Sequence, residues 1–130
     1  MMKKMLVFLL ILSYWLFPQE SFAEDISNVV ENVLRGVVVV IGKGPSRQSF
    51  GSGFFVSSNG DVLTNFHVVE GMNSIFVKNH DKKVYPAEVK AFDKEKDMAV
   101  LSTNLPKKSF SVLPLAKKTP KIGTAVLAIG

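Results

Sequence analysis

The sequence contains no cysteine, which excludes disulfide bonds, zinc–thiolate sites and a cysteine nucleophile. Its two histidines, His67 and His80, are 13 positions apart, so a metal bound by both would need carboxylates to complete its shell. The Gly-x-Ser-x-Gly elbow of α/β-hydrolases, the phosphate-binding Gly-x-x-x-x-Gly-Lys-Ser/Thr loop and the His-Glu-x-x-His pair of zinc peptidases are also missing. We therefore expect neither a metal nor another cofactor.

Charge of one sign is not concentrated anywhere in the chain. The 130 residues carry a formal net charge of +5, but 16 Lys and Arg are interspersed with 11 Asp and Glu. The sequence lacks the long basic stripe that is typical of nucleic-acid binding. We expect an ordinary solvated surface and no nucleic-acid partner.

Long apolar runs are rare, and the clearest lies near the N-terminus. Thirteen uncharged residues, 5–17, follow two lysines, and Ser21-Phe22-Ala23 places small residues where signal peptidase reads them. The run is short for a hydrocarbon core that needs about 20 apolar residues. Residues 1–23 are predicted to be a signal peptide, so the protein would be exported, periplasmic or secreted, with no stable membrane span after cleavage. An uncleaved anchor is the alternative.

The rest of the chain predicts one helix and then strands. Apolar residues at helical spacing predict a short amphipathic helix over residues 24–36. Short β-favouring runs separated by turn residues follow, without a βαβ rhythm, and an antiparallel barrel or sandwich fits them best. The apolar run 37–41 indicates a strand that is buried on both faces or lines a barrel. The other expected strands are 51–56, 62–66, 74–78, 83–92, 97–101 and 124–129, with Pro86 favouring an edge or a bulge in the fourth of these.

The most informative stretch, residues 51–69, predicts a hairpin that ends in a histidine. Asn59-Gly60 is a strong hairpin signal, because both central positions of the favoured turn need positive φ. Gly51 and Gly53 allow another part of the backbone to approach closely. His67 is then placed at the exit of the returning strand, where an imidazole is suited to general-base chemistry. The alternative is a rim histidine that only makes local hydrogen bonds.

A carboxylate is a candidate partner for this histidine. Asp97 follows His67 by 30 positions and begins a predicted strand. A buried carboxylate that accepts a hydrogen bond from an imidazole fixes the tautomer of the ring and stabilises its protonated form. On composition alone, Asp97 is equally well explained as a turn residue, and His80 is expected to be a solvated turn residue.

Three motifs occur in this order: Gly51-Ser52-Gly53-Phe54, Leu63-Thr64-Asn65-Phe66-His67-Val68-Val69 and Asp97-Met98-Ala99-Val100-Leu101. Together they resemble the N-terminal half of trypsin-like serine proteases of the HtrA/Deg group. The resemblance implies an all-β fold in which this chain forms the first antiparallel six-stranded β-barrel of a chymotrypsin-like double barrel. It also implies that His67 and Asp97 are catalytic, that the activity is serine endopeptidase hydrolysis of unfolded or misfolded exported proteins, and that the full-length form is a homo-oligomer acting on polypeptide substrates. Residues 113–115 and 122–130 extend the match in the same order.

The sequence departs from the family in one respect: it contains no Gly-Asn-Ser-Gly-Gly, the family motif around the nucleophilic serine. Ser52 precedes His67 and is expected to be structural. We therefore predict a barrel over residues 37–118, the truncated start of a second barrel over 119–130, and no activity for these 130 residues alone. Two alternatives to an incomplete peptidase remain at this point: a non-catalytic remnant that acts as a binding module, and a different histidine-dependent or metal-binding enzyme.

Overall fold

The computed structural model describes residues 21–130. The boundary between two compact units falls between Val30 and Glu31, and the second unit is Glu31–Gly130. Residues 1–20, which carry most of the predicted signal peptide, lie outside the described part. Helix α2, Ser21–Leu34, takes the place of the helix expected over 24–36 and begins three residues earlier. None of the helices in the described part of the chain is long and apolar enough to cross a membrane.

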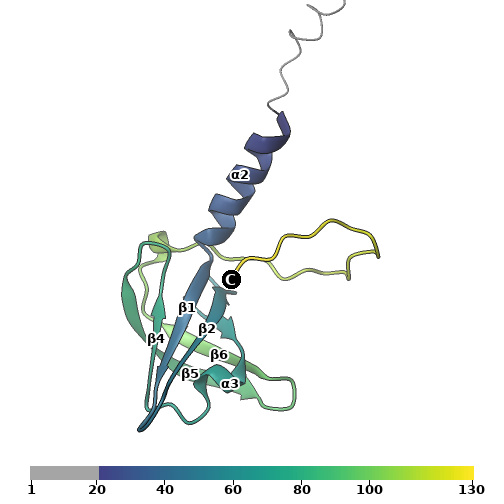
Figure 1. The fold of residues 1–130 in the computed structure, drawn as a ribbon. Coiled ribbons are helices and arrows are strands. Elements are labelled where there is room, and N and C mark those ends of the chain that lie inside the picture. The colour runs from purple at the N-terminus through teal and green to yellow at the C-terminus, as the bar shows by residue number, and fades with distance from the viewer. Residues whose placement is uncertain (1–20) are drawn as a thin grey trace, which may run out of the picture. The chain divides into compact units, whose positions relative to one another are not determined.

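The second unit is built around a closed antiparallel barrel (Figure 1). Its strands follow the order β1-β2-β3-β6-β5-β4 around the wall, and every neighbouring pair is antiparallel. The predicted six-stranded barrel is thus confirmed, and the alternative of an open sandwich is excluded. The strands are β1 Val37–Lys43, β2 Gln48–Phe55, β3 Val62–Thr64, β4 Ser74–Lys78, β5 Val84–Asp93 and β6 Met98–Thr103.

The barrel interior is filled by alternate residues of the strands, as the two-residue period of a strand requires. In β1, Val38 and Val40 are buried, whereas Val39 between them is 37% exposed. The apolar run 37–41 therefore lines a barrel with one face and is not buried on both. Phe55, fully buried, stacks on Phe110 with 4.0 Å between ring centroids, which extends the core beyond the strands.

The turn between β2 and β3 differs from the predicted two-residue turn. Only Gly60 has positive φ, +87°, and the loop closes through Gly60 N–H to Ser57 O (3.2 Å) and Val56 N–H to Asp61 O (2.9 Å). The Ser57 hydroxyl donates to the Asp61 carboxylate at 2.8 Å. These bonds stabilise a four-residue loop, so the register of the hairpin comes from Ser57 and Asp61 as well as from Gly60.

Pro86 lies within β5 and not at a bulge. It faces Phe76 of β4, and pairing with β6 begins only at the next residue, Ala87. The missing N–H of Pro86 therefore removes no bond from the β5–β6 ladder. The irregularity in β5 falls at Lys90 instead, between Val89 and Ala91.

The strand expected over residues 124–129 is not formed. These residues carry no regular secondary structure, and Val126 is 81% exposed. A strand needs a partner, and the closed barrel leaves no open edge for pairing. The preceding segment does attach to the barrel, because Ser111 N–H donates to Arg35 O (3.2 Å) and Leu113 N–H donates to Phe55 O (2.9 Å).

Candidate active site

His67 lies on α3, Phe66–Val69, a single helical turn that follows β3 after Asn65. Val68 and Val69 on this turn are buried in the core and fix its orientation. Gly51 of β2 makes the close contact possible, since a Cβ there would lie 2.5 Å from Val68 Cγ2. The predicted role of Gly51 in close approach is thus explained by the packing of α3 on β2.

A second set of contacts joins α3 to the β5–β6 hairpin. The ring of Phe66 stacks on Phe92 of β5 with 4.8 Å between centroids. The Lys94 ammonium lies 5.9 Å from the centre of the Phe66 ring and 2.7 Å from Glu70 Oε1. These contacts bring the helical turn with His67 against the hairpin turn with Asp97.

Asp97 occupies an uncommon backbone conformation at the end of that hairpin turn. Its φ is +51°, in the left-handed region where aspartate is among the few residues that are tolerated. Its N–H donates to Lys94 O at 3.2 Å, and β6 begins at the next residue. The conformation turns the chain and leaves the Asp97 carboxylate facing α3, where it accepts two bonds from His67.

The carboxylate binds both the backbone and the ring of His67. Asp97 Oδ1 accepts the His67 N–H at 2.8 Å, and Oδ2 lies 2.7 Å from His67 Nδ1. These bonds hold the pKa of Asp97 below its usual value, the backbone N–H of His67 being the largest cause and its ring the next. An ionised carboxylate only accepts hydrogen bonds, so Nδ1 carries the proton and donates it to Asp97.

The exposure of the pair leaves the second ring nitrogen accessible. The His67 side chain is 70% exposed and that of Asp97 is 42% exposed. The Asp97 carboxylate, which contacts α3 and the hairpin turn, is thus only partly buried in this chain. With Nδ1 bound to Asp97, Nε2 is the nitrogen that can accept a proton from another group.

Asn65 is a member of the site that reasoning from the sequence did not single out. Its Nδ2 donates to the Asp97 carbonyl at 3.1 Å and to Asp97 Oδ2 at 3.2 Å. The sequence held a signal for it: an asparagine directly before a helical turn is typical of an N-cap. The side chain of Asn65 makes no capping bond, however, and contacts Asp97 instead.

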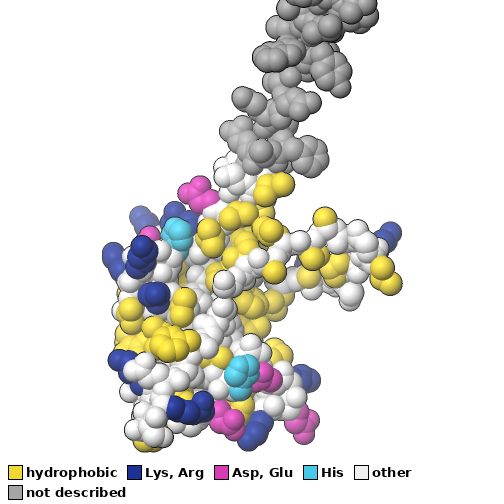
Figure 2. Space-filling model, in the orientation of Figure 1, with side chains coloured by type: hydrophobic (Ala, Val, Ile, Leu, Met, Phe, Trp, Pro, Cys, Tyr) yellow, Lys and Arg dark blue, Asp and Glu magenta, His cyan; other side chains and the backbone are white. Residues whose placement is uncertain are grey.

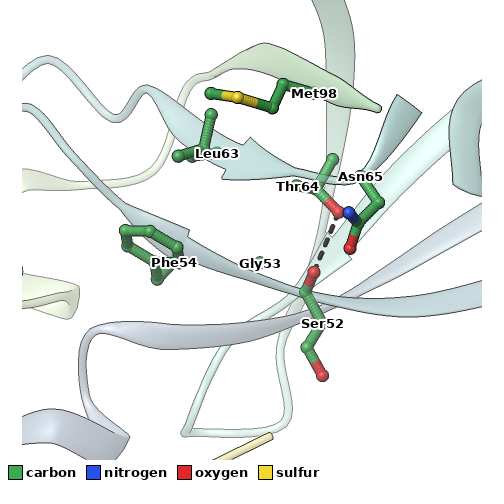
Figure 3. A pocket seen from close by; sticks show the side chains of 7 residues that line it. All are labelled: Ser52, Gly53, Phe54, Leu63, Thr64, Asn65 and Met98. Carbon is green, nitrogen blue, oxygen red and sulfur yellow. Dashed lines mark hydrogen bonds between the residues drawn. The ribbon is translucent and has the colours of Figure 1, made fainter. Parts of the chain in front are cut away.

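Ser52 behaves as a structural residue, as expected. It pairs with Val39 in the barrel wall, and its carbonyl accepts the Thr64 hydroxyl at 2.8 Å (Figure 3). Beside it is an apolar hollow of about 320 Å³. The hollow is lined by Ser52, Gly53, Phe54, Leu63, Thr64, Asn65 and Met98.

No serine hydroxyl among residues 21–130 is hydrogen-bonded to the His67 ring, whose bonded partner is Asp97. The hydroxyls of Ser49, Ser57 and Ser109 donate to Val68 O, to the Asp61 carboxylate and to Pro106 O, respectively. The described part of the chain thus contains the bonded pair of His67 and Asp97, and no serine hydroxyl is bonded to that pair.

His80 is exposed in the β4–β5 turn and lies well apart from His67, as the two separate histidines in Figure 2 show. Within the described residues, no group of three or more His, Asp or Glu side chains has the arrangement of a metal site. The structure therefore brings together His67 and Asp97 and does not bring the two histidines together.

Comparison with known proteins places these features in a family. The profile described as "Trypsin-like peptidase domain" matches residues 51–130. A protein named "Probable periplasmic serine endoprotease DegP-like" from Hahella chejuensis is 42% identical over 90 residues, which cover 68% of this chain and 19% of that protein. "Protease Do-like 1, chloroplastic" from Arabidopsis thaliana is 36% identical over 84 residues, covering 64% of this chain and 19% of that protein.

A solved structure supports the same family. The crystal structure of the serine endoprotease from Yersinia pestis superposes with a TM-score of 0.64 at 29% identity, covering 72% of this chain and 34% of that one. The chain belongs to the trypsin-like peptidase family, and its resemblance to the HtrA/Deg group is confirmed. Its barrel corresponds to the first barrel of the chymotrypsin-like fold. The chain spans about a fifth of the length of the curated relatives it matches.

Proposed function

We propose that this chain supplies the proton-transfer half of a serine endopeptidase of the HtrA/Deg group that cleaves polypeptides. The observation that carries the proposal is the bond between His67 Nδ1 and Asp97 Oδ2, 2.7 Å long, which leaves Nε2 open to a reacting group. Names of relatives such as "serine endoprotease" support the reaction class. The alternative of a non-catalytic binding module has no comparable support.

In this reaction a serine hydroxyl attacks the peptide carbonyl and loses its proton to His67 Nε2. Asp97 keeps the ring oriented and stabilises the imidazolium that forms. His67 then gives the proton to the leaving amine, and a water molecule repeats the cycle on the acyl-enzyme. The nucleophile and the backbone donors that stabilise the oxyanion would come from a second barrel, which would carry the Gly-Asn-Ser-Gly-Gly that this sequence lacks.

The test compares the 130-residue chain with a longer chain that includes a second barrel. A serine-directed fluorophosphonate should label only the longer chain, which alone should hydrolyse an unfolded protein substrate such as reduced casein. His67→Ala in the longer chain should abolish turnover, while His80→Ala, which changes the exposed turn histidine, should leave it unchanged. Stoichiometric labelling of the 130-residue chain, at Ser52 above all, would contradict the proposal.

We also propose that the protein is exported and that residues 1–23 are removed. The relatives named "periplasmic" support export, and N-terminal sequencing of protein from the cell envelope should begin at Glu24. Met1 on a membrane-bound species would support the uncleaved anchor instead. The homo-oligomeric form implied by the family remains a prediction, which light scattering on the longer chain would test.

A further inference from the structure

The structure assigns Asn65 as the positioning residue that holds Asp97 in the orientation required to bind His67. This inference deepens the proposed function, because it concerns the same pair of residues. It rests on three features of the described chain: the two hydrogen bonds from Asn65 to Asp97, the left-handed backbone conformation of Asp97, and the absence of a capping hydrogen bond from the Asn65 side chain to α3.

The first feature is that one amide group binds both the backbone and the side chain of Asp97. The Asn65 Nδ2 group has two hydrogens, and its two acceptors are the backbone carbonyl of Asp97 at 3.1 Å and the carboxylate Oδ2 at 3.2 Å. A bond to the carboxylate alone would leave the backbone free to rotate. Bonds to both fix the side-chain torsion relative to the backbone, which determines where Oδ2 points.

The second feature explains why Asp97 needs such a partner. Its φ of +51° belongs to the left-handed region, which residues other than glycine seldom adopt unless surrounding bonds hold them there. The Asp97 side chain is also 42% exposed, so packing alone does not fix it. The donors from Asn65 and His67 are what keep the residue in this state.

The third feature separates positioning from helix capping. Asn65 stands at the N-cap position of α3 with φ −77° and ψ 142°, yet its side chain does not bond to the helix. The N–H of His67, in the first turn, is accepted by Asp97 Oδ1 instead. The carboxylate therefore caps α3, and Asn65 orients the carboxylate.

A role in positioning Asp97 and a role in capping α3 predict opposite results for Asn65→Asp. Aspartate caps helices as well as asparagine does, so a capping role would survive this substitution. A carboxylate has no hydrogen to donate and would repel Asp97, so a positioning role would be lost. Asn65→Ala removes the donor without adding charge, and Asn104→Ala, at an exposed asparagine after β6, is the matched control.

The readout is the imidazole ring of His67 in the 130-residue chain, followed by ¹⁵N and ¹H NMR. We expect the wild-type ring to hold the Nδ1–H tautomer with a protected Nδ1 proton, unlike the exposed ring of His80, which serves as an internal reference. In Asn65→Ala and Asn65→Asp, the His67 ring signals should move toward those of His80, and exchange of the His67 amide proton should become at least tenfold faster. Asn104→Ala should match the wild type.

Wild-type ring signals in Asn65→Asp would overturn the proposal and assign Asn65 to helix capping. Unchanged signals in Asn65→Ala, or a wild-type His67 ring that already resembles His80, would overturn it as well. In the longer chain, Asn65→Ala should lower kcat by roughly 10²-fold, as small misplacements of a catalytic group do, with little change in KM. The NMR result does not depend on catalysis, so failure of the longer chain to cleave protein would contradict only the proposed function.

Discussion

Two aspartates of this barrel, Asp61 and Asp97, both accept hydrogen bonds at their carboxylates, but the groups that donate these bonds differ. Each lies at the end of a hairpin turn and has a pKa held below its usual value. For Asp61 the largest cause is the Ser57 hydroxyl, followed by the Lys90 ammonium 3.0 Å away. For Asp97 the causes are the backbone N–H and then the ring of His67.

The difference lies in the chemistry of the donors and in the exposure of the carboxylates. The Asp61 side chain is only 15% exposed, against 42% for Asp97, and its partner Lys90 is an ammonium group that acts as a point charge. The imidazole beside Asp97 has a second nitrogen that can accept and return a proton, and its side chain is 70% exposed. The same arrangement therefore stabilises a turn at one site and leaves an accessible imidazole nitrogen at the other.

The largest expected effect separates the two aspartates by activity. In the longer chain, Asp97→Asn should lower kcat by about 10⁴-fold, the loss measured for the equivalent change in a trypsin-like enzyme, because the ring takes the wrong tautomer. Asp61→Asn should leave kcat within about threefold at a temperature where the variant is folded. Turnover of an unfolded protein substrate measures both, and equal losses would show that the two sites do not differ in function.

The next effect concerns the packing that brings His67 to Asp97. Gly51→Ala should destabilise the chain by about 1–3 kcal/mol, because the new methyl group would overlap Val68 on α3. Gly44→Ala is the matched control, since its Cβ would meet its nearest atoms at 3.3 Å. Urea unfolding gives the stabilities. If Gly51→Ala proves as stable as Gly44→Ala, α3 does not depend on the close approach to β2.

A smaller effect follows from the pH dependence of Asp61. Because its pKa is lower in the folded chain than the unfolded value of about 3.9, its contribution is fully present above that pH and is lost as the pH falls through the folded pKa. Asp61→Asn should cost about 1 kcal/mol at pH 7 and converge with the wild type in acid. Asp81→Asn, in an exposed turn, should change the free energy of unfolding neither at pH 7 nor in acid. If the free energies of unfolding of Asp61→Asn and the wild type fall in parallel as the pH is lowered, this account is wrong.

The smallest effect concerns the C-terminal segment, away from the bonds of both aspartates. Deleting residues 119–130 should change the free energy of unfolding by less than about 0.5 kcal/mol, because the segment forms no strand. It should raise solubility, since Ile122, Val126 and Leu127 are exposed. Static light scattering and urea unfolding measure the two quantities. A large loss of stability would mean that the segment contributes to the core of the barrel.

The sequence predicted the barrel and the pairing of His67 with Asp97 because both depend on patterns that are local or motif-like. Strand alternation and turn residues gave six strands close to their final bounds, and two motifs gave the two site residues. The turn after β2 was predicted less well. The Asn59-Gly60 signal did not show that Ser57 and Asp61 would form a side-chain bond and change the turn type.

The remaining errors depend on long-range contacts. The apolar segment 124–129 has strand propensity, but propensity does not show whether a partner edge exists, and a closed barrel has none to offer. Asn65 was missed for a related reason. Its partner, Asp97, is 32 positions away, and no local rule connects an N-cap asparagine to a left-handed aspartate in another hairpin.

The closure of the barrel also determines when the site comes into existence during folding. Strands β3 and β6 are neighbours in the wall, although β4 and β5 lie between them in the chain. Non-local pairings of this kind form slowly, because the entropy of closing a long loop opposes them until other contacts compensate. His67 and Asp97 lie next to this pairing, because Thr64 pairs with Ala99 in the β3–β6 ladder. We expect a partly folded chain that has not yet formed this ladder to lack the assembled pair.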